Sequence, residues 1–208
     1  MRLEEMKLKE INLDDSFYAR KQVESLIIIY NIVDKQKKRL EAYEQTQEES
    51  EIIEKIRLIT NEIYSGCEII NQLFISIYRN DDRYRGTNLK RGFNDNFKEV
   101  YNAFVKRDKE IRGVYKDKFI SSFFYDARNW FIMLHDIRTQ ETHYEVGKIV
   151  KFDGKIYYIN GNRNGTSKNL YTNPSDKIKL EIKEIVKNIE EFLKTEDKIA
   201  KLVISNSC

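Results

Sequence analysis

Histidine, proline, cysteine and glycine are all scarce in this chain of 208 residues, which has 2, 1, 2 and 8 of them respectively. Proline and glycine are the strongest helix breakers, so their scarcity favours long helices. The two cysteines, Cys67 and Cys208, fit neither a disulfide framework nor a zinc site. A reducing, cytoplasmic compartment is therefore the expectation.

Long apolar runs and a strong net charge are also lacking. The tract Leu26-Ile27-Ile28-Ile29 is far shorter than the roughly 18 residues of a membrane span. The N-terminal stretch does not have the basic-then-apolar form of a signal peptide. The formal net charge is only +3, so a basic site would have to be local. We therefore expect a soluble protein with no membrane partner.

Apolar residues recur at spacings of three and four along much of the chain, which is the helical pattern. The repeat is clearest between residues 51 and 79, where Gly66 stands in the apolar stripe and favours close packing. The same pattern predicts helices over residues 14–43, 51–79, 94–105, 117–143 and from about 176 to 194 or beyond. Asn173-Pro174-Ser175-Asp176 is typical of a helix start.

The period changes after residue 146. Two β-rich runs, Gly147–Phe152 and Lys155–Ile159, flank Asp153-Gly154. An Asp-Gly pair between such runs predicts a hairpin, because both central residues of a type I′ turn need positive φ. The expected fold is therefore mainly α. It is a bundle of four to five helices in a single domain over residues 1–208, with a β-hairpin at about 147–159 inserted before the last helix.

Both histidines fall in the stretch Asp126–His143, which reads DARNWFIMLHDIRTQETH. On one continuous helix, Arg128 and His135 are two turns apart and stack on the same side, about 10 Å from each other. The apolar residues Phe123, Ala127, Trp130, Leu134 and Ile137 gather on the opposite side. Such a polar stripe favours a cleft or a subunit interface.

Arg138 and His143 are five residues apart, which is about 140° around an unbroken helix. They can converge only if the helix ends or distorts between them, or if a second copy supplies one of them. A helix end near His143 is expected, since the hairpin begins soon after it.

An Arg-x4-His motif in a helical bundle of this size resembles the HEPN superfamily, and the stretch IRTQETHYEVG resembles a clostridial-type group within it. The resemblance implies a small helical bundle that forms a homodimer, with the Arg and His of both copies meeting at the interface. It also implies a metal-independent ribonuclease of a toxin or defence system, or a relative that has lost catalysis and only binds. Carried over, the motif falls on Arg138 and His143. Arg128-Asn129 with His135 is a second candidate.

RNA can be cut without a metal when its own 2′-OH attacks the adjacent phosphorus. A histidine can move the proton, and an arginine can hold the phosphate by bidentate hydrogen bonds. We assign these roles to His143 and Arg138, and expect a 2′,3′-cyclic phosphate product. The expected supporting residues are Arg128, Asn129, His135, Glu141 and Tyr144. No cofactor is implied, and two histidines eight residues apart do not have a zinc-site spacing.

Two other interpretations stay open. The same polar stripe can belong to a non-catalytic interaction or nucleotide-binding module. The chain can also be a helical structural protein without a ligand. In that case His135 lies at the edge of the core and His143 interacts with a helix-end dipole.

Overall fold

The computed structural model describes residues 13–42, 48–78, 89–107, 110–143, 147–159 and 179–205. Within these ranges only the backbone is described at residues 13–20, 77, 140–143, 179 and 200–205. The chain divides into two compact units. Unit 1 comprises 1–30, 65–129 and 194–208, and unit 2 comprises 31–64 and 130–193.

The fold is mainly α, as the sequence predicts. A small antiparallel sheet precedes the last helix and adds a third strand to the predicted hairpin. The described residues form six α-helices: α1 (Leu13–Glu41), α2 (Glu49–Tyr78), α3 (Phe93–Tyr101), α4 (Lys118–Ala127), α5 (Phe131–His143) and α6 (Ile182–Ser205). A π-helical turn, η4 (Asn102–Lys106), continues α3, and a 3-10 turn, η5 (Gly113–Lys116), precedes α4. The strands are β1 (Lys148–Phe152), β2 (Lys155–Ile159) and β3 (Lys179–Glu181).

Two boundaries differ from the prediction. The expected helix over 117–143 is interrupted at residues 128–130, which form a turn between α4 and α5. The backbone N–H groups of Arg128 and Asn129 bond the carbonyls of Tyr125 and Asp126, three residues back, at 3.4 and 3.1 Å. Such i→i−3 bonds tighten a last helical turn. The last helix begins at Ile182 because β3 takes residues 179–181 into the sheet, and the expected start at 173–176 lies outside the described residues.

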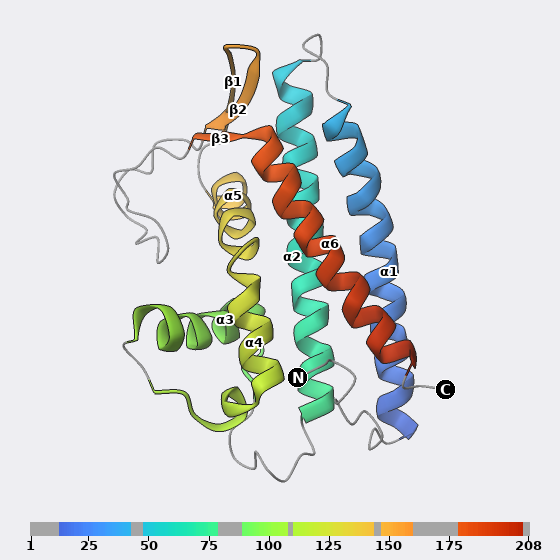
Figure 1. Ribbon diagram of the computed structural model, residues 1–208. Coiled ribbons are helices and arrows are strands. Elements are labelled where there is room, and N and C mark those ends of the chain that lie inside the picture. Colours follow the sequence, from blue (N-terminus) through green and yellow to red (C-terminus); the bar gives the residue numbers. More distant parts are fainter. Residues whose placement is uncertain are drawn as a thin grey trace. The chain divides into compact units, whose positions relative to one another are not determined.

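Aromatic side chains fill the core of unit 1. Phe74 of α2 makes edge-to-face contacts with Phe119 and Phe123 of α4, at 5.5 and 4.8 Å between ring centroids. Phe93 of α3 meets Phe124 at 5.1 Å. These contacts place α3 beside α4 (Figure 1). Burial of large aromatic side chains, with ring pairs of this geometry, is a strong source of packing energy.

The predicted apolar stripe of α2 is buried in both units. Ile52, Ile56, Ile59 and Ile63 contribute to the core of unit 2, and Cys67, Ile70 and Leu73 to that of unit 1. On α1 the buried apolar side chains are Val23, Leu26, Ile29, Val33 and Leu40, which recur at spacings of three, four and seven, whereas Ile27 and Ile28 are exposed. Both long helices therefore bury one face, as helical periodicity predicts.

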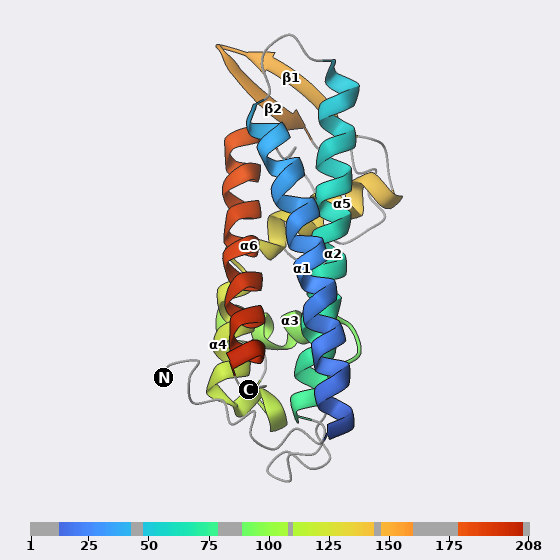
Figure 2. The ribbon, with the colours of Figure 1, turned by 90° about the vertical axis from the view of Figure 1, so that its right-hand side faces the viewer.

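The sheet of unit 2 has the order β1-β2-β3 and is antiparallel throughout. Phe152 pairs with Lys155 across the turn, and Asp153 and Gly154 have φ values of 51° and 68°. Two successive positive φ angles are what a type I′ turn requires, so the predicted hairpin is confirmed. Figure 2 shows β1 and β2 at the same end of unit 2 as the last turn of α1 and the first turn of α2.

Candidate functional site

Arg138 and His135 meet around one aromatic ring in unit 2. The guanidinium carbon of Arg138 lies 4.3 Å from the centroid of the Tyr64 ring. The imidazole of His135 lies 6.1 Å from the same ring and 5.3 Å from that of Phe131. Arg138 and His135 both belong to α5, three residues apart, while Tyr64 belongs to α2. Helical spacing puts Arg138 and His135 on one side of α5, and Tyr64 packs against both.

The surroundings of His135 are those of a residue at the edge of the core. Its side chain is 16% exposed, and its Nδ1 lies 4.0 Å from Oδ1 of Asp136, a carboxylate that is itself buried. Two aromatic rings cover much of the imidazole. His135 is therefore packed against protein over most of its side chain.

Helix α5 runs without a break from Phe131 to His143. It ends at the residue expected from the sequence, but no distortion lies between Arg138 and His143. Five residues of α-helix rotate a side-chain direction by about 140°. The backbone of a single copy therefore directs these two residues toward different sides of α5.

Three of the expected site residues are not described at the level of their side chains. The backbone of Glu141 and His143 belongs to α5, while their side chains lie outside the described residues. Tyr144 lies wholly outside them. Of the expected catalytic pair, Arg138 alone has described surroundings.

Arg128 and Asn129 lie in the turn that ends α4, in unit 1. Arg128 stacks on Tyr125, with its guanidinium carbon 3.6 Å from the ring centroid, and its Nη1 donates a 2.8 Å hydrogen bond to the Tyr125 carbonyl. Asn129 is exposed. The expectation that Arg128 and His135 stack on one side of a continuous helix is wrong, because the helix stops between them.

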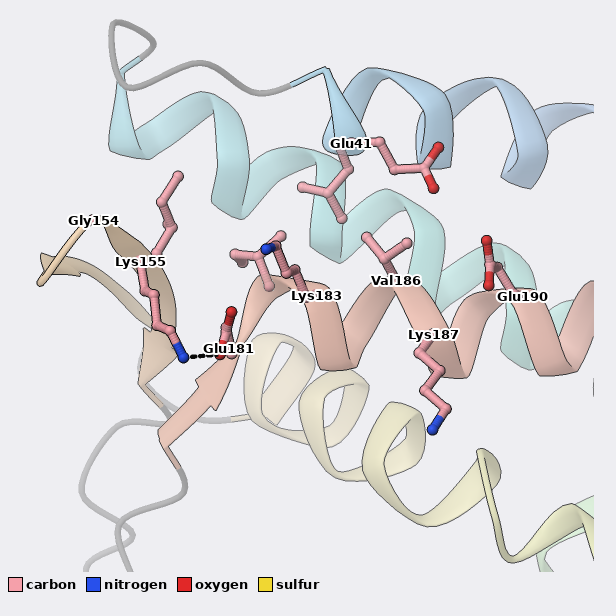
Figure 3. A pocket seen from close by; sticks show the side chains of 11 residues that line it. Glu41, Gly154, Lys155, Glu181, Lys183, Val186, Lys187 and Glu190 are labelled. Atoms are coloured by element: carbon pink, nitrogen blue, oxygen red, sulfur yellow. Dashed lines mark hydrogen bonds and ion pairs between the residues drawn. The ribbon is translucent and has the colours of Figure 1, made fainter.

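A pocket of about 670 Å³ lies elsewhere in unit 2 (Figure 3). Its walls are the last turn of α1, the tip of the hairpin and the first turns of α6, and its lining residues are Leu40, Glu41, Gly154, Lys155, Ile156, Glu181, Ile182, Lys183, Val186, Lys187 and Glu190. None of the expected site residues lines it. No periodicity or motif singled out this pocket, because three separate segments form it.

Charges around the pocket are largely paired. Lys155 bonds Glu181 at 3.1 Å on one side, and Figure 3 shows Glu41 and Glu190 away from that pair. Lys37, beside the pocket, binds Glu190 at 3.1 Å and Glu41 at 3.5 Å. Burial opposes the charge of Lys37, but these two carboxylates together raise its pKa. Lys183 and Lys187 add two exposed cations to the lining.

Sequence reasoning missed two further groups. Tyr64 contacts both Arg138 and His135, but no sequence pattern marks it, because the contact depends on how α2 packs against α5. Glu196 of α6 is 1% exposed in unit 1, and burial raises its pKa to about 8. Burial also raises the pKa of the Cys67 thiol well above its usual range, so this cysteine is not an activated nucleophile.

Searches of protein-family models, curated proteins and solved structures gave no match to this chain. Among the described residues, no three histidine, cysteine or carboxylate side chains gather in the manner of a metal site. No described helix combines the length and apolarity that crossing a bilayer needs.

Proposed function

We propose that this chain is a HEPN-like, metal-independent endoribonuclease that works as a homodimer. The proposal rests on the Arg-x4-His motif, with Arg138 as the phosphate clamp and His143 as the proton-transfer residue. The observation that supports it best is the contact of Arg138 with Tyr64. This contact holds a guanidinium on the helix that ends at His143.

The fixed guanidinium suits phosphate recognition. A planar guanidinium donates two parallel hydrogen bonds to phosphate oxygens. Holding it against Tyr64 reduces the rotational freedom that would otherwise be lost when the substrate binds. Arg138 is half-buried, so its environment is less aqueous than bulk solvent and its attraction for a phosphate is stronger than in water.

The proposed reaction needs no metal or cofactor. The 2′-oxygen forms a bond to phosphorus while the bond from phosphorus to the 5′-oxygen breaks. The proton of the 2′-OH goes to a base, and the departing 5′-oxygen takes up a proton from an acid. His143 serves one of these transfers, and Arg138 offsets the charge on the non-bridging oxygens. The products are a 2′,3′-cyclic phosphate end and a 5′-hydroxyl end.

The continuity of α5 favours a site shared between two copies. Within one copy, Arg138 and His143 diverge by about 140°. In a symmetric dimer each copy presents the same helix to its partner, so Arg138 of one copy can face His143 of the other. Each dimer would then carry two composite sites.

Mixing two inactive variants tests this arrangement. His143→Ala is expected to lower cleavage of single-stranded RNA in EDTA by about 10²-fold or more, as loss of a general acid–base group does. Arg138→Ala should have an effect of about the same size, because the charge on the phosphate oxygens loses its stabilising hydrogen bonds. After subunit exchange at equal amounts, about half the dimers are mixed, and each mixed dimer has one intact composite site. Activity should return to about one quarter of wild type.

The control is a mixture of wild type with the Arg138→Ala, His143→Ala double variant. Its mixed dimers have no intact composite site, because each site lacks one of the two residues. Absence of cleavage by the wild type would exclude the nuclease. Cleavage that both single variants retain would exclude the assigned residues. Failure of the mixture to recover activity would exclude the shared site.

A second candidate function is nucleotide binding without catalysis, and the pocket of unit 2 favours it. Its volume of about 670 Å³ lies within the usual range of small-molecule sites. Leu40, Ile156 and Val186 supply apolar lining, while Lys183 and Lys187 supply cations for phosphates. Calorimetric titration with a panel of mononucleotides tests this function. Binding that a Lys183→Ala, Lys187→Ala variant loses, and that Arg138→Ala retains, would support it.

A further inference from the structure

Three apolar side chains remain exposed together in unit 1. Phe104 and Val105 lie on the π-helical turn η4, and Tyr125 lies near the end of α4. Phe104 is 45% exposed and Tyr125 is 36% exposed. Their ring centroids are 5.6 Å apart. Two aromatic rings on neighbouring elements thus form one continuous surface, which we name the Phe104–Tyr125 surface.

Arg128 extends this surface by a flat cation. Its guanidinium stacks 3.6 Å from the Tyr125 ring centroid, and its Nη1 bonds the Tyr125 carbonyl at 2.8 Å. The two contacts hold the guanidinium over the Tyr125 ring. Aromatic rings and arginine planes are the groups on which proteins stack unpaired bases.

Further cations adjoin the Phe104–Tyr125 surface. Lys106 and Arg107 are exposed and directly follow Val105, and Arg107 closes η4 with a left-handed φ of 55°. Asp126 is the exposed acid beside Tyr125. Within three residues of either ring, a stretch that the structure describes, there are three cations and one carboxylate. This balance favours a polyanionic partner over a second copy of this chain, whose identical surface would bring like charges together. A π-helical turn is also a feature found often at functional sites.

We infer that the Phe104–Tyr125 surface binds single-stranded nucleic acid by stacking its bases, with Lys106, Arg107 and Arg128 contacting phosphates. The choice of RNA as the natural ligand rests on the proposed function. The stacking itself does not, because it needs only an unpaired base and a phosphate backbone, which RNA and DNA share. The inference gives the proposed nuclease a site that holds substrate by its bases rather than at the scissile bond.

Fluorescence anisotropy with short labelled strands tests the inference without relying on cleavage. The probes are single-stranded DNA and 2′-O-methyl RNA, neither of which can be cut by 2′-OH attack, with double-stranded RNA for comparison. A 2-aminopurine base in the strand reports stacking by loss of its fluorescence. Phe104→Ala and Tyr125→Ala are expected to weaken single-strand binding by roughly 5- to 100-fold each and to reduce the fluorescence loss.

Two variants serve as controls. Tyr125→Phe keeps the ring and should bind as wild type does. Phe152→Ala removes an aromatic side chain that is 65% exposed on β1 and belongs to unit 2, and it should also leave binding unchanged. Because all the altered side chains are partly exposed, the variants should fold, and circular dichroism checks this.

The outcomes separate this inference from the nuclease proposal. Stacking that depends on Phe104 and Tyr125 supports it, even if the wild type cuts no RNA. The inference is overturned if the protein cuts RNA but binds single strands equally well with and without Phe104→Ala and Tyr125→Ala. It is also overturned if wild type binds no single strand, or if Tyr125→Ala abolishes a dimer in sedimentation, since the surface would then contact a second copy.

Discussion

A methyl group added at Gly147 would collide with a buried tyrosine. An ideal Cβ at this position would overlap the ring carbons of Tyr158, whose side chain is fully buried in unit 2. The backbone before β1 therefore approaches β2 as closely as only glycine permits. The close approach explains why a glycine opens the hairpin, a point that hairpin periodicity alone does not show.

Gly147→Ala should lower the free energy of unfolding by about 1–3 kcal/mol, because overpacking forces a buried ring to move. Urea unfolding followed by circular dichroism measures this. The matched control is Gly154→Asn in the hairpin turn. Its φ of 68° is left-handed, no atom lies within 4 Å of the added Cβ, and asparagine tolerates such a φ. Equal stability of Gly147→Ala and wild type would contradict the packing argument.

Glu196 should make the stability of the protein depend on pH. Burial raises its pKa to about 8, and neither carboxylate oxygen has a hydrogen-bond partner among the described residues. Between the unfolded pKa near 4.5 and about 8, the folded state retains a proton that the unfolded state releases. The free energy of unfolding is therefore highest, as far as Glu196 is concerned, below pH 4.5. It falls as the pH rises from there toward 8, by at most about 1.4 kcal/mol per pH unit.

Glu196→Gln should remove this slope and make the variant more stable than wild type at pH 8, since an amide cannot ionise. Urea unfolding between pH 5 and 9 measures both effects. Glu110→Gln makes the same chemical change at an exposed side chain paired with Arg112, and should leave the wild-type slope in place. A slope that survives in Glu196→Gln would assign the pH dependence to another group.

At the scale of elements, helix α4 begins at a strong cap. The carboxylate of Asp117 accepts hydrogen bonds from the backbone N–H groups of Phe119 and Ile120, at 2.9 and 3.2 Å. The hydroxyl of Tyr78, at the end of α2, donates a third bond to the same oxygen at 3.1 Å. Asp117 therefore satisfies the first turn of α4 and ties it to α2.

Asp117→Ala should destabilise the protein by about 1–2 kcal/mol, because two helix N–H groups lose their acceptor. Asp117→Asn retains an accepting oxygen and should cost less. Tyr78→Phe removes only the hydrogen bond that joins α2 to Asp117, and it should lower the free energy of unfolding by about 1 kcal/mol. Urea unfolding of the three variants measures these differences. A larger loss for Tyr78→Phe than for Asp117→Ala would show that capping is not the main role of Asp117.

At the end of α4, apolar periodicity predicts which residues are buried but does not predict where the helix stops. The apolar positions Ala127, Trp130, Leu134 and Ile137 are all buried, as one continuous helix would have them. The chain nevertheless turns at residues 128–130, where no glycine or proline gives a signal. Trp130 packs on Phe192 of α6 at 5.3 Å, a contact between distant parts of the sequence. Local spacing could not reveal it.

At the scale of the whole molecule, the specific activity of the proposed nuclease should depend on protein concentration. A site shared by two copies is lost when the dimer dissociates, so specific activity should fall on dilution as the dimer population falls. RNA cleavage over a dilution series, compared with sedimentation at the same concentrations, measures this. A monomer that retains full specific activity would contradict the shared site.

The sequence by itself determined the fold class, most helix positions, the hairpin and the stretch of the chain that holds both histidines. These depend on local periodicity, turn chemistry and residue type, which neighbouring residues specify. The tertiary structure alone decided that Tyr64 packs against both Arg138 and His135, that Arg128 stacks on Tyr125 beside Phe104, and that Glu196 is buried. Each of these follows from side chains that are distant in sequence or from a helix end without a sequence signal, and packing rather than local preference determines both.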